Sequence, residues 1–463
     1  MSVIKALELF RKELGSEIEI LADQHNGAFI EYAKRWTDIG RKTPAAIVVP
    51  SSEIQIQKTV KWAVENSVPF VTKSGGHSEW STIDSSGIII DLSKYSSIEV
   101  NAAEQKATLR GSILAKQVSV ALAEVGLFTA LGNGNPIGAI PYFLNGGASV
   151  VTSCVGYGSD QILSARMIDA RGNLIEVTDS EKDMADLLWA LRGAGQFFGL
   201  ITELTVKAYP FSALGNDQGV IWTGVFILPL ERAGEVAEAM NIVANDSTHP
   251  TSGLMMIMAP PPKNDPALVI SARYRGNPEN AAQAYKPLYD LNPLMANGAP
   301  VPIQNTSDGH EAFNEKGTFK RFATTCLPHF NATAIPDVVQ LWKTMVTECP
   351  DAITTSFNFQ WDSRLAPVPA HAPSSCSSLR DTRLWQNNFI WHTDVNSRNK
   401  VDEFSDRAIA AMRGDGERRE FQNATREGPI ELRYRDPVKL AKLKQLKQVW
   451  DPNGVYTRQL LDG

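Results

Sequence analysis

The sequence predicts an α+β fold of two domains, and three observations support this prediction. At 463 residues the chain is longer than one small hydrophobic core accommodates. Its hydrophobic share of 43% and charged share of 21% are those of a soluble globular protein. Up to Pro210, short strand-like segments alternate with helix-like ones, whereas from Val220 onward longer strand-like runs alternate with long amphipathic stretches.

The first block begins with an amphipathic segment at 1–14, which predicts a helix. Residues 51–66 carry apolar side chains at helical spacing, and a strand at 69–72 runs directly into a glycine-rich turn. The other predicted elements of this block are strands at 45–49, 88–92, 97–101 and 107–110 and a helix at 113–125.

The central block is predicted to form an antiparallel sheet backed by helices. Its proline- and glycine-rich connections at 259–262, 298–302 and 366–373 indicate surface loops. Strands are predicted at 220–228, 252–258, 268–274, 354–359 and 384–391, and helices at 230–243 and 334–347. Two last helices, at 402–413 and 436–449, are expected to return the chain to the first domain, so the predicted domains are 1–210 with 402–463, and 211–401.

Charge and cysteine content exclude several classes of partner. A net charge of -6 argues against a nucleic acid or an anionic membrane. The four cysteines have no metal-type spacing, so we expect reduced thiols and no metal. The N-terminal segment lacks the apolar core of a signal peptide, and no stretch is long enough to span a membrane. These features predict an intracellular, cytoplasmic protein.

The glycine-rich turn reads Lys73-Ser74-Gly75-Gly76-His77-Ser78. Two adjacent glycines allow close approach to a ligand and a row of N–H donors, which suits a pyrophosphate. Lys73 would add positive charge, and His77 stands where an imidazole can do chemistry. The alternative is an ordinary strand–turn–strand with a chance histidine.

Several later segments resemble those of flavoproteins in the vanillyl-alcohol oxidase superfamily, which includes the berberine-bridge-enzyme-like proteins and p-cresol methylhydroxylase (PCMH). The similar segments are 73–78, 87–93, 145–148, 156–163, 169–172, 186–202 and 449–456. The resemblance is strong in the first 210 residues and near the C-terminus, and weak between them. It implies a two-domain PCMH-type FAD-binding fold, in which both chain ends enclose a central substrate domain, with FAD as cofactor.

By this resemblance, a ring nitrogen of His77 is bonded to the 8α-methyl group of FAD. Many berberine-bridge-like enzymes have a second bond from a cysteine, and Asn135 stands at that position here. The expected state is therefore a single histidyl bond.

The resemblance also implies the remaining FAD contacts, although each position could equally be a structural turn. The pyrophosphate is expected at Ser74, Gly75, Gly76 and Ser78, beside Lys73, and the flavin at Asn135, Pro136 and Gly138 and at the second glycine loop with Gly146 and Gly147. Asp160 and Ile162 are expected near the adenosine, and Gly199 and Ile201 would add backbone contacts.

On the substrate side, Tyr434 is the first candidate for the catalytic base and His392 the second. Tyr142 is the third candidate catalytic residue and could cover the flavin, and Asn358 and Gln360 could point into the cleft. For each of these residues, a role in an ordinary sheet or core is the alternative.

The resemblance implies an FAD-dependent oxidoreductase, and we expect an oxidase that uses O2 on a small specialised metabolite in a biosynthetic pathway. The substrate would be an alcohol, an amine or an activated C–H compound, and cyclisation or desaturation could accompany oxidation. One alternative is a flavin-containing cyclase or isomerase without net redox change. Another is a flavin-binding protein without catalysis. The expected partners are the substrate and O2.

Overall fold

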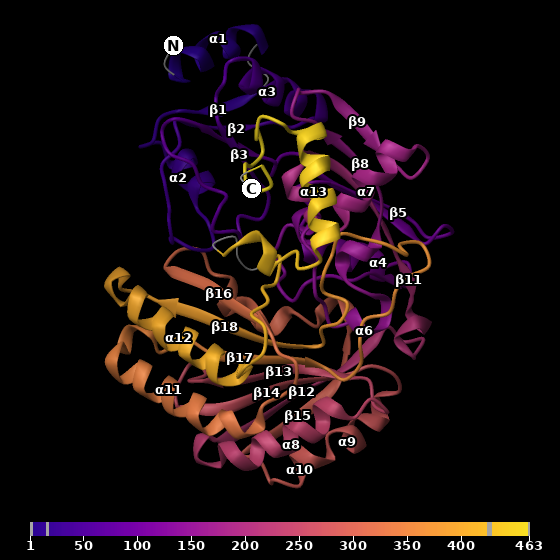
Figure 1. The fold of residues 1–463 in the computed structure, drawn as a ribbon, viewed down its shortest axis with the longest axis vertical. Helices are drawn as coiled ribbons and strands as arrows, with labels where there is room; N and C mark the ends of the chain where they lie inside the picture. Colours follow the sequence, from indigo (N-terminus) through magenta and orange to yellow (C-terminus); the bar gives the residue numbers. More distant parts are fainter. Residues whose placement is uncertain (1–2, 15–17, 424–427, 462–463) are drawn as a thin grey trace.

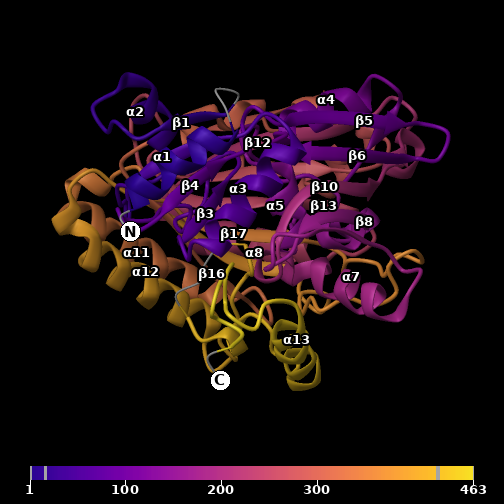
Figure 2. The same ribbon diagram turned by 90° about the horizontal axis from the view of Figure 1, so that it is seen from above.

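The structure is a computed structural model that describes residues 3–14, 18–423 and 428–461. Figure 1 shows two halves: the N-terminal elements with the C-terminal helix α13 (Pro437–Trp450) above, and a broad sheet with helices on its outer face below. Seen from above in Figure 2, α13 lies beside α7 (Lys182–Ala194). The two ends of the chain thus share one half of the molecule.

A small sheet of order β1-β2-β4-β3 opens the upper half. Strands β2 (Ala46–Val49), β4 (Ile88–Asp91) and β3 (Phe70–Lys73) are parallel, and β1 (Glu19–Leu21) is antiparallel to β2. The apolar runs of β2 and β4 are buried along their whole length, as expected of parallel strands covered on both faces. Helices α1 (Val3–Leu14) and α3 (Glu53–Glu65) pack on this sheet, and Ser52 caps α3 by accepting a hydrogen bond from the N–H of Gln55.

An antiparallel sheet of order β5-β6-β10-β8-β9 completes this half. Its apolar face packs against α5 (Ala139–Leu144), α7 and α13. The strands are β5 (Ser96–Asn101), β6 (Lys106–Gly111), β8 (Ile162–Ile168), β9 (Leu174–Val177) and β10 (Leu200–Lys207), with α4 (Ala115–Ala123) after β6 and the short pair β7 (Leu127–Phe128) and β11 (Tyr209–Pro210) beside them.

The lower half is built on an antiparallel sheet of order β15-β12-β14-β13-β17-β18-β16. Three long helices cover its outer face (Figure 1): α8 (Ala233–Asn245), α11 (Ile335–Glu348) and α12 (Arg398–Arg413). The strands are β12 (Val220–Pro229), β13 (Thr251–Met258), β14 (Ala267–Tyr274), β15 (Met295–Pro302), β16 (Phe319–Cys326), β17 (Phe357–Asp362) and β18 (Leu384–His392). The α+β fold and the antiparallel sheet backed by helices are therefore confirmed.

Four elements differ from the sequence-based expectation. The segment 298–302 was expected to be a loop, but it forms the exposed edge strand β15, where proline is tolerated. A glycine is needed in this strand, because a Cβ at Gly298 would lie 2.1 Å from the ring of Trp222. Strand β16 was not predicted, and β17 begins three residues later than expected. Helix α12 packs on β16, β18 and α11, so it belongs with the central sheet, whereas 402–413 was assigned to the first domain. The other domain limits stay predictions.

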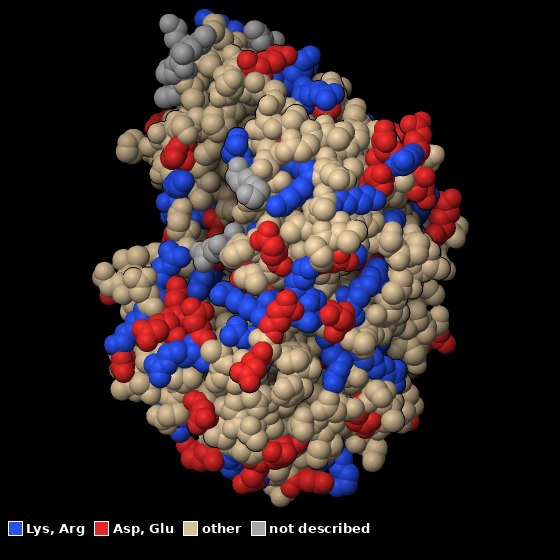
Figure 3. All heavy atoms as spheres, viewed as in Figure 1, with Lys and Arg blue, Asp and Glu red and all other residues tan. Residues whose placement is uncertain are grey.

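Ion pairs join the segment before α13 to the loop between β17 and β18. Arg419 and Arg435 both contact Asp381 and Glu417. On the face shown in Figure 3, basic side chains gather across the middle with acidic ones between them. Along the described ranges, no helix combines the length and the apolar character needed to cross a membrane.

The C-terminal motif at 449–456 closes the upper half with a buried ion pair. Lys447 and Asp451 have no exposed side-chain surface, and their charged atoms are 2.5 Å apart. Lys447 also donates to the carbonyl of Phe197, while Asp451 accepts from the N–H groups of Val455 and Tyr456. The motif thus has a structural role, because it anchors α13 and the following turn.

Replacing Asp451 by asparagine should lower the free energy of unfolding by about 3–5 kcal/mol, because Lys447 would remain buried without a counter-charge. The matched control is Asp290→Asn, which removes an i,i+4 pair with Lys286 whose side chains are more than half exposed. It should change stability by less than about 0.5 kcal/mol. Urea unfolding measures both variants, and equal effects would contradict the structural role of the buried pair.

Candidate functional site

The glycine-rich turn lies at the carboxyl end of β3, where ligands bind in open parallel sheets. It packs directly on the turn at 134–138. A Cβ on Gly75 would lie 2.3 Å from the carbonyl oxygen of Pro136 and 2.8 Å from the nitrogen of Gly138. Gly76 has a φ of 71°, which favours glycine. Both glycines are therefore required by the backbone itself.

The main-chain N–H groups of this turn are available to a ligand. From Ser74 to Ser78, none of them donates a hydrogen bond to an acceptor among the described residues. Buried or half-buried N–H groups without partners are uncommon, and a row of them forms an anion-binding concavity. The turn therefore fits the pyrophosphate of a dinucleotide.

Lys73 does not supply the free positive charge expected of it. Its ammonium group is buried and lies 2.7 Å from a carboxylate oxygen of Asp91 and 2.6 Å from the carbonyl oxygen of Tyr32. This ion pair joins the ends of β3 and β4 and holds the start of the turn in place. Lys73 acts on the site by positioning the turn.

His77 is half-buried and stacks on Trp36, with 5.5 Å between ring centres. Trp36 stacks in turn on Phe322 and Phe389 from the central sheet, so the histidine stands at the seam between the halves. Burial lowers the pKa of His77 to about 4, and the nearby charges of Lys320 and Lys316 act in the same direction. The imidazole is thus neutral at neutral pH, with a lone pair available for bonding.

Lys320 is a site residue that the sequence did not reveal, because β16 was not predicted. Its ammonium lies 5.5 Å from the ring centre of Trp36 and 4.7 Å from that of Trp391. It also donates to the carbonyl of Glu315. Burial lowers the pKa of Lys320 to about 8. A cation thus faces the same aromatic cluster as His77.

The turn at 134–138 supplies backbone to the site, while the Asn135 side chain points elsewhere. Its amide donates to Asp308 at 2.9 Å, and Lys116 contacts the same carboxylate at 2.7 Å. Pro136 and Gly138 contact the glycine-rich turn through their backbones. Cys154 donates to the carbonyl of Ala213, and none of the four free cysteines belongs to this turn.

Tyr142 supports the second glycine loop and does not present its hydroxyl to a ligand. Its hydroxyl donates to the carbonyl of Ala148 at 2.9 Å, and burial raises its pKa. Cβ atoms at Gly132, Gly147 and Gly158 would all lie within 3 Å of its ring. Gly146 and Gly147 have φ values of 107° and 74°. A catalytic role for Tyr142 was expected, but the structure favours a positioning role.

The residues expected near the adenosine lie on the five-stranded sheet and the turn before it. Asp160 is engaged within the protein: its carboxylate lies 2.7 Å from Arg380 and accepts from the N–H of Tyr157. Ile162 begins β8, Gly199 packs on Met167, and Ile201 pairs with Met167 in the sheet. Their contact with the adenosine stays a prediction, while the side chain of Asp160 is already committed to Arg380.

Neither candidate base faces the seam. His392 lies on the same face of β18 as Asn388, which donates to Ser405 of α12; it is fully buried and stacks on Phe319. Because side chains alternate along a strand, Phe389 and Trp391 face the seam and His392 faces the helices. Tyr434 is 1% exposed, packs on Phe197, and donates to the carbonyl of Gly193 at 2.7 Å. The sequence alone could not show in which direction these two side chains point.

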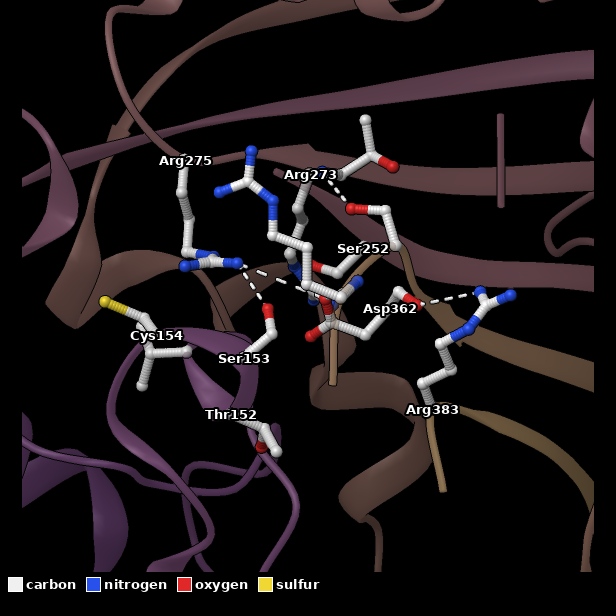
Figure 4. A network of polar contacts seen from close by, with 12 residues as sticks. Thr152, Ser153, Cys154, Ser252, Arg273, Arg275, Asp362 and Arg383 are labelled. Atoms are coloured by element: carbon white, nitrogen blue, oxygen red, sulfur yellow. Dashed lines mark hydrogen bonds and ion pairs between the residues drawn. The ribbon is translucent and has the colours of Figure 1, made fainter. Parts of the chain in front are cut away.

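A polar cavity lies between the central sheet and the loops of the first half. Gln360 lines it, as expected, and Asn358 lies two residues before Gln360 on the same strand. Beside it, Arg275, the residue after β14, hydrogen bonds to Ser153 of α6 (Thr152–Val155) and lies 4.0 Å from Asp362 (Figure 4). Burial raises the pKa of Asp362, and Arg275 opposes that shift. The remaining lining includes Asn133, Ser149, Tyr157, Arg273 and Trp385.

Comparisons with known proteins agree with this site. Residues 44–178 match the FAD binding domain family. The chain is 29% identical to the FAD-linked oxidoreductase hasG of Aspergillus fumigatus, over 95% of this chain and 96% of the relative. It is 25% identical to the FAD-linked oxidoreductase tazG of Aspergillus terreus, over 96% and 92% of the two chains.

Two solved structures share the whole fold. The 6-hydroxy-D-nicotine oxidase of Arthrobacter nicotinovorans has a TM-score of 0.81 at 21% identity and covers 96% of this chain and 97% of its own. The berberine-bridge-enzyme-like protein 1 of Physcomitrella patens has a TM-score of 0.82 at 16% identity, over 98% and 97%. Together with the glycine-rich turn, these matches show a chain that contains an FAD binding domain, is similar over its length to FAD-linked oxidoreductases, and shares the fold of these two solved structures.

Proposed function

We propose that the protein is an oxidase that holds FAD through one covalent bond to His77, oxidises a small specialised metabolite and returns the electrons to O2. The observation that carries the proposal is the glycine-rich turn, with its row of unpartnered N–H groups followed by a neutral imidazole. The absence of cysteine from the turn at 134–138 supports a single bond. Bound FAD would supply the hydride acceptor.

The residues of this chain divide the work between holding FAD and admitting the substrate. The backbone of Ser74–Ser78 would hold the pyrophosphate, and His77 would fix the flavin at the seam. The polar cavity under the central sheet would receive the substrate, with Gln360 as a hydrogen-bonding group. Oxidases among the similar structures, such as the chitooligosaccharide oxidase, support oxidation of a small molecule.

A second function is favoured by one observation, the orientation of the two candidate bases. Because His392 and Tyr434 both point away from the cavity, the chain offers no assigned base for alcohol or amine oxidation. A flavin-containing cyclase or isomerase without net redox change would not require oxidation of its substrate. The mass of the product separates these functions, since oxidation removes two hydrogens and isomerisation leaves the mass unchanged.

The proposal is tested by acid precipitation of the purified protein and its His77→Ala variant. The yellow colour should stay in the wild-type pellet and leave the variant completely, because only a covalent bond survives denaturation. His329→Ala is the matched control, since this histidine is exposed and outside the site. Its pellet should stay yellow. Release of flavin from the wild-type protein would contradict the covalent bond, and a colourless protein would contradict FAD binding as a whole.

A further inference from the structure

The polar cavity contains a buried arginine, Arg273, that forms no ion pair with the described residues. Arg273 lies on β14 and is 2% exposed. Its Nε and Nη2 atoms have no hydrogen-bond partner among the described residues. A buried charge without a partner is strongly unfavourable, so such groups are rare unless a ligand completes them.

The other arginines in and beside this cavity are all engaged. Arg275, which follows the end of β14, contacts Ser153 and Asp362, whereas no contact of the Arg273 guanidinium is marked in Figure 4. Arg383 donates to the carbonyl of Ala244 and to Asn245. Arg364 donates to the carbonyls of residues 247 and 248. The unpaired state is therefore particular to Arg273.

A second unpartnered donor lies beside it. Ser252 of β13 is the register partner of Arg273 and lines the same cavity, and its buried hydroxyl has no hydrogen-bond partner in the described part of the chain. Because the bases of the two side chains are directly opposite on neighbouring strands, both groups can reach one ligand. A hydroxyl and a planar guanidinium fork together suit a carboxylate, which accepts hydrogen bonds at both oxygens.

The charge of Arg273 persists at the pH at which the protein would work. Burial lowers its pKa to about 10, and no carboxylate acts to raise it again. Asp362 also lines the cavity, but it is held by Arg275 and Ser153. His310, which lies close enough for Arg273 to lower its pKa, hydrogen bonds to the carbonyl of Asn133. The cavity therefore has a fixed cation that is ready for an anion.

We propose that the substrate carries a carboxylate group and that Arg273, with Ser252, binds it. This inference rests on the proposed function, because it specifies the chemical class of the molecule that the oxidase would take. It places the acidic end of the substrate at β13 and β14. The oxidisable end is then left for the part of the seam nearer to His77 and Trp36. A neutral sugar or an amine without an acidic group would leave the guanidinium unpaired.

Benzoate and benzamide test the proposal, since they share a shape and differ in charge. Calorimetric titration of the flavin-bearing protein should show that benzoate binds about tenfold or more tightly than benzamide. Arg273→Leu should remove this preference, and Arg273→Lys should retain part of it. Arg364→Gln is the matched control, because it removes a cation from the same cavity whose donors are already used. It should retain the preference.

The proposal would be overturned if the wild-type protein bound benzoate and benzamide with equal affinity, and cinnamate and its amide with equal affinity as well. It would also be overturned by a preference that survives in Arg273→Leu. Thermal unfolding separates ligand binding from a structural effect of the substitution. Benzoate should raise the melting temperature of the wild type but not that of Arg273→Leu. Without ligand, Arg273→Leu should melt at a temperature no lower than the wild type does. An unstable Arg273→Leu would show that the guanidinium is structural and would also overturn the proposal.

Flavin content separates this proposal from the one on which it rests. The acid pellets of all Arg273 variants should remain as yellow as that of the wild type. Loss of flavin only from Arg273→Leu would show that Arg273 serves FAD, which overturns carboxylate binding. Loss of flavin from the wild-type pellet would contradict the histidyl bond, while the difference between benzoate and benzamide could still be measured by calorimetry.

Discussion

Replacing Gly75 by alanine should deprive the protein of FAD. The added Cβ would lie 2.3 Å from the carbonyl oxygen of Pro136 and 2.8 Å from the nitrogen of Gly138, and both are backbone atoms that cannot turn aside. The two turns would have to move apart. That movement would displace the N–H groups of 74–78 from one common anion and would carry His77 with them. Losing two or more charge-assisted hydrogen bonds should weaken FAD binding by about 100-fold or more.

The ratio of flavin to protein absorbance after gel filtration measures this effect. Gly234→Ala is the matched control, because a Cβ there meets nothing within 4 Å and the residue lies in helix α8. This variant should keep its full flavin content and gain about 0.5–1 kcal/mol in stability from helix propensity. A Gly75→Ala protein with normal flavin would show that the two turns can separate without cost to the cofactor site.

Local sequence patterns predicted those strands whose burial is evident from their own apolar residues. The runs 46–49 and 88–90 are apolar because parallel strands are covered on both faces, so these strands were found. Strand β15 was missed because it is an exposed edge strand that contains proline. Its extended structure depends on pairing with β12, which its own sequence does not reveal. Strand β16 was missed for a related reason: its alternation of Lys320, Phe322 and Thr324 faces the other half of the molecule and carries no simple polar pattern.

The site divides in the same way. The function of the turn at 73–78 could be predicted locally, because its two glycines shape the backbone that would bind the ligand and the histidine follows directly in the same turn. His392 and Tyr434 were wrongly expected at the cleft because the direction of a side chain depends on strand register and on what packs behind it. Arg273 was not singled out, since only the folded structure reveals that its Nε and Nη2 atoms find no hydrogen-bond partner among the described residues. Local chemistry was therefore predictable, whereas the substrate side required tertiary structure.

Flavin attachment should be almost independent of pH between 7 and 5, which an ordinary histidine would not allow. With a pKa of about 4, His77 is about nine-tenths neutral at pH 5, whereas a histidine with the usual pKa of ~6.5 would be about 3% neutral. Only the neutral imidazole has the lone pair that forms the bond. The rate of covalent incorporation of FAD into apoprotein should therefore fall less than about twofold, and a fall of about 25-fold would contradict the lowered pKa.

The same pKa predicts how the stability of the apoprotein depends on pH. Because the folded value lies below that of the unfolded chain, unfolding takes up a proton between these two values. The contribution of His77 to stability is complete above pH ~6.5 and is lost as the pH falls towards 4, by up to about 3 kcal/mol. Burial is the main cause and Lys320 the second, so Lys320→Met should raise the pKa of His77 and slow attachment at pH 5 but not at pH 7. Lys343→Met, on the outer face of α11, should leave both rates unchanged. If Lys320→Met also leaves both rates unchanged, the low pKa of His77 comes from burial and Lys316 without a contribution from Lys320.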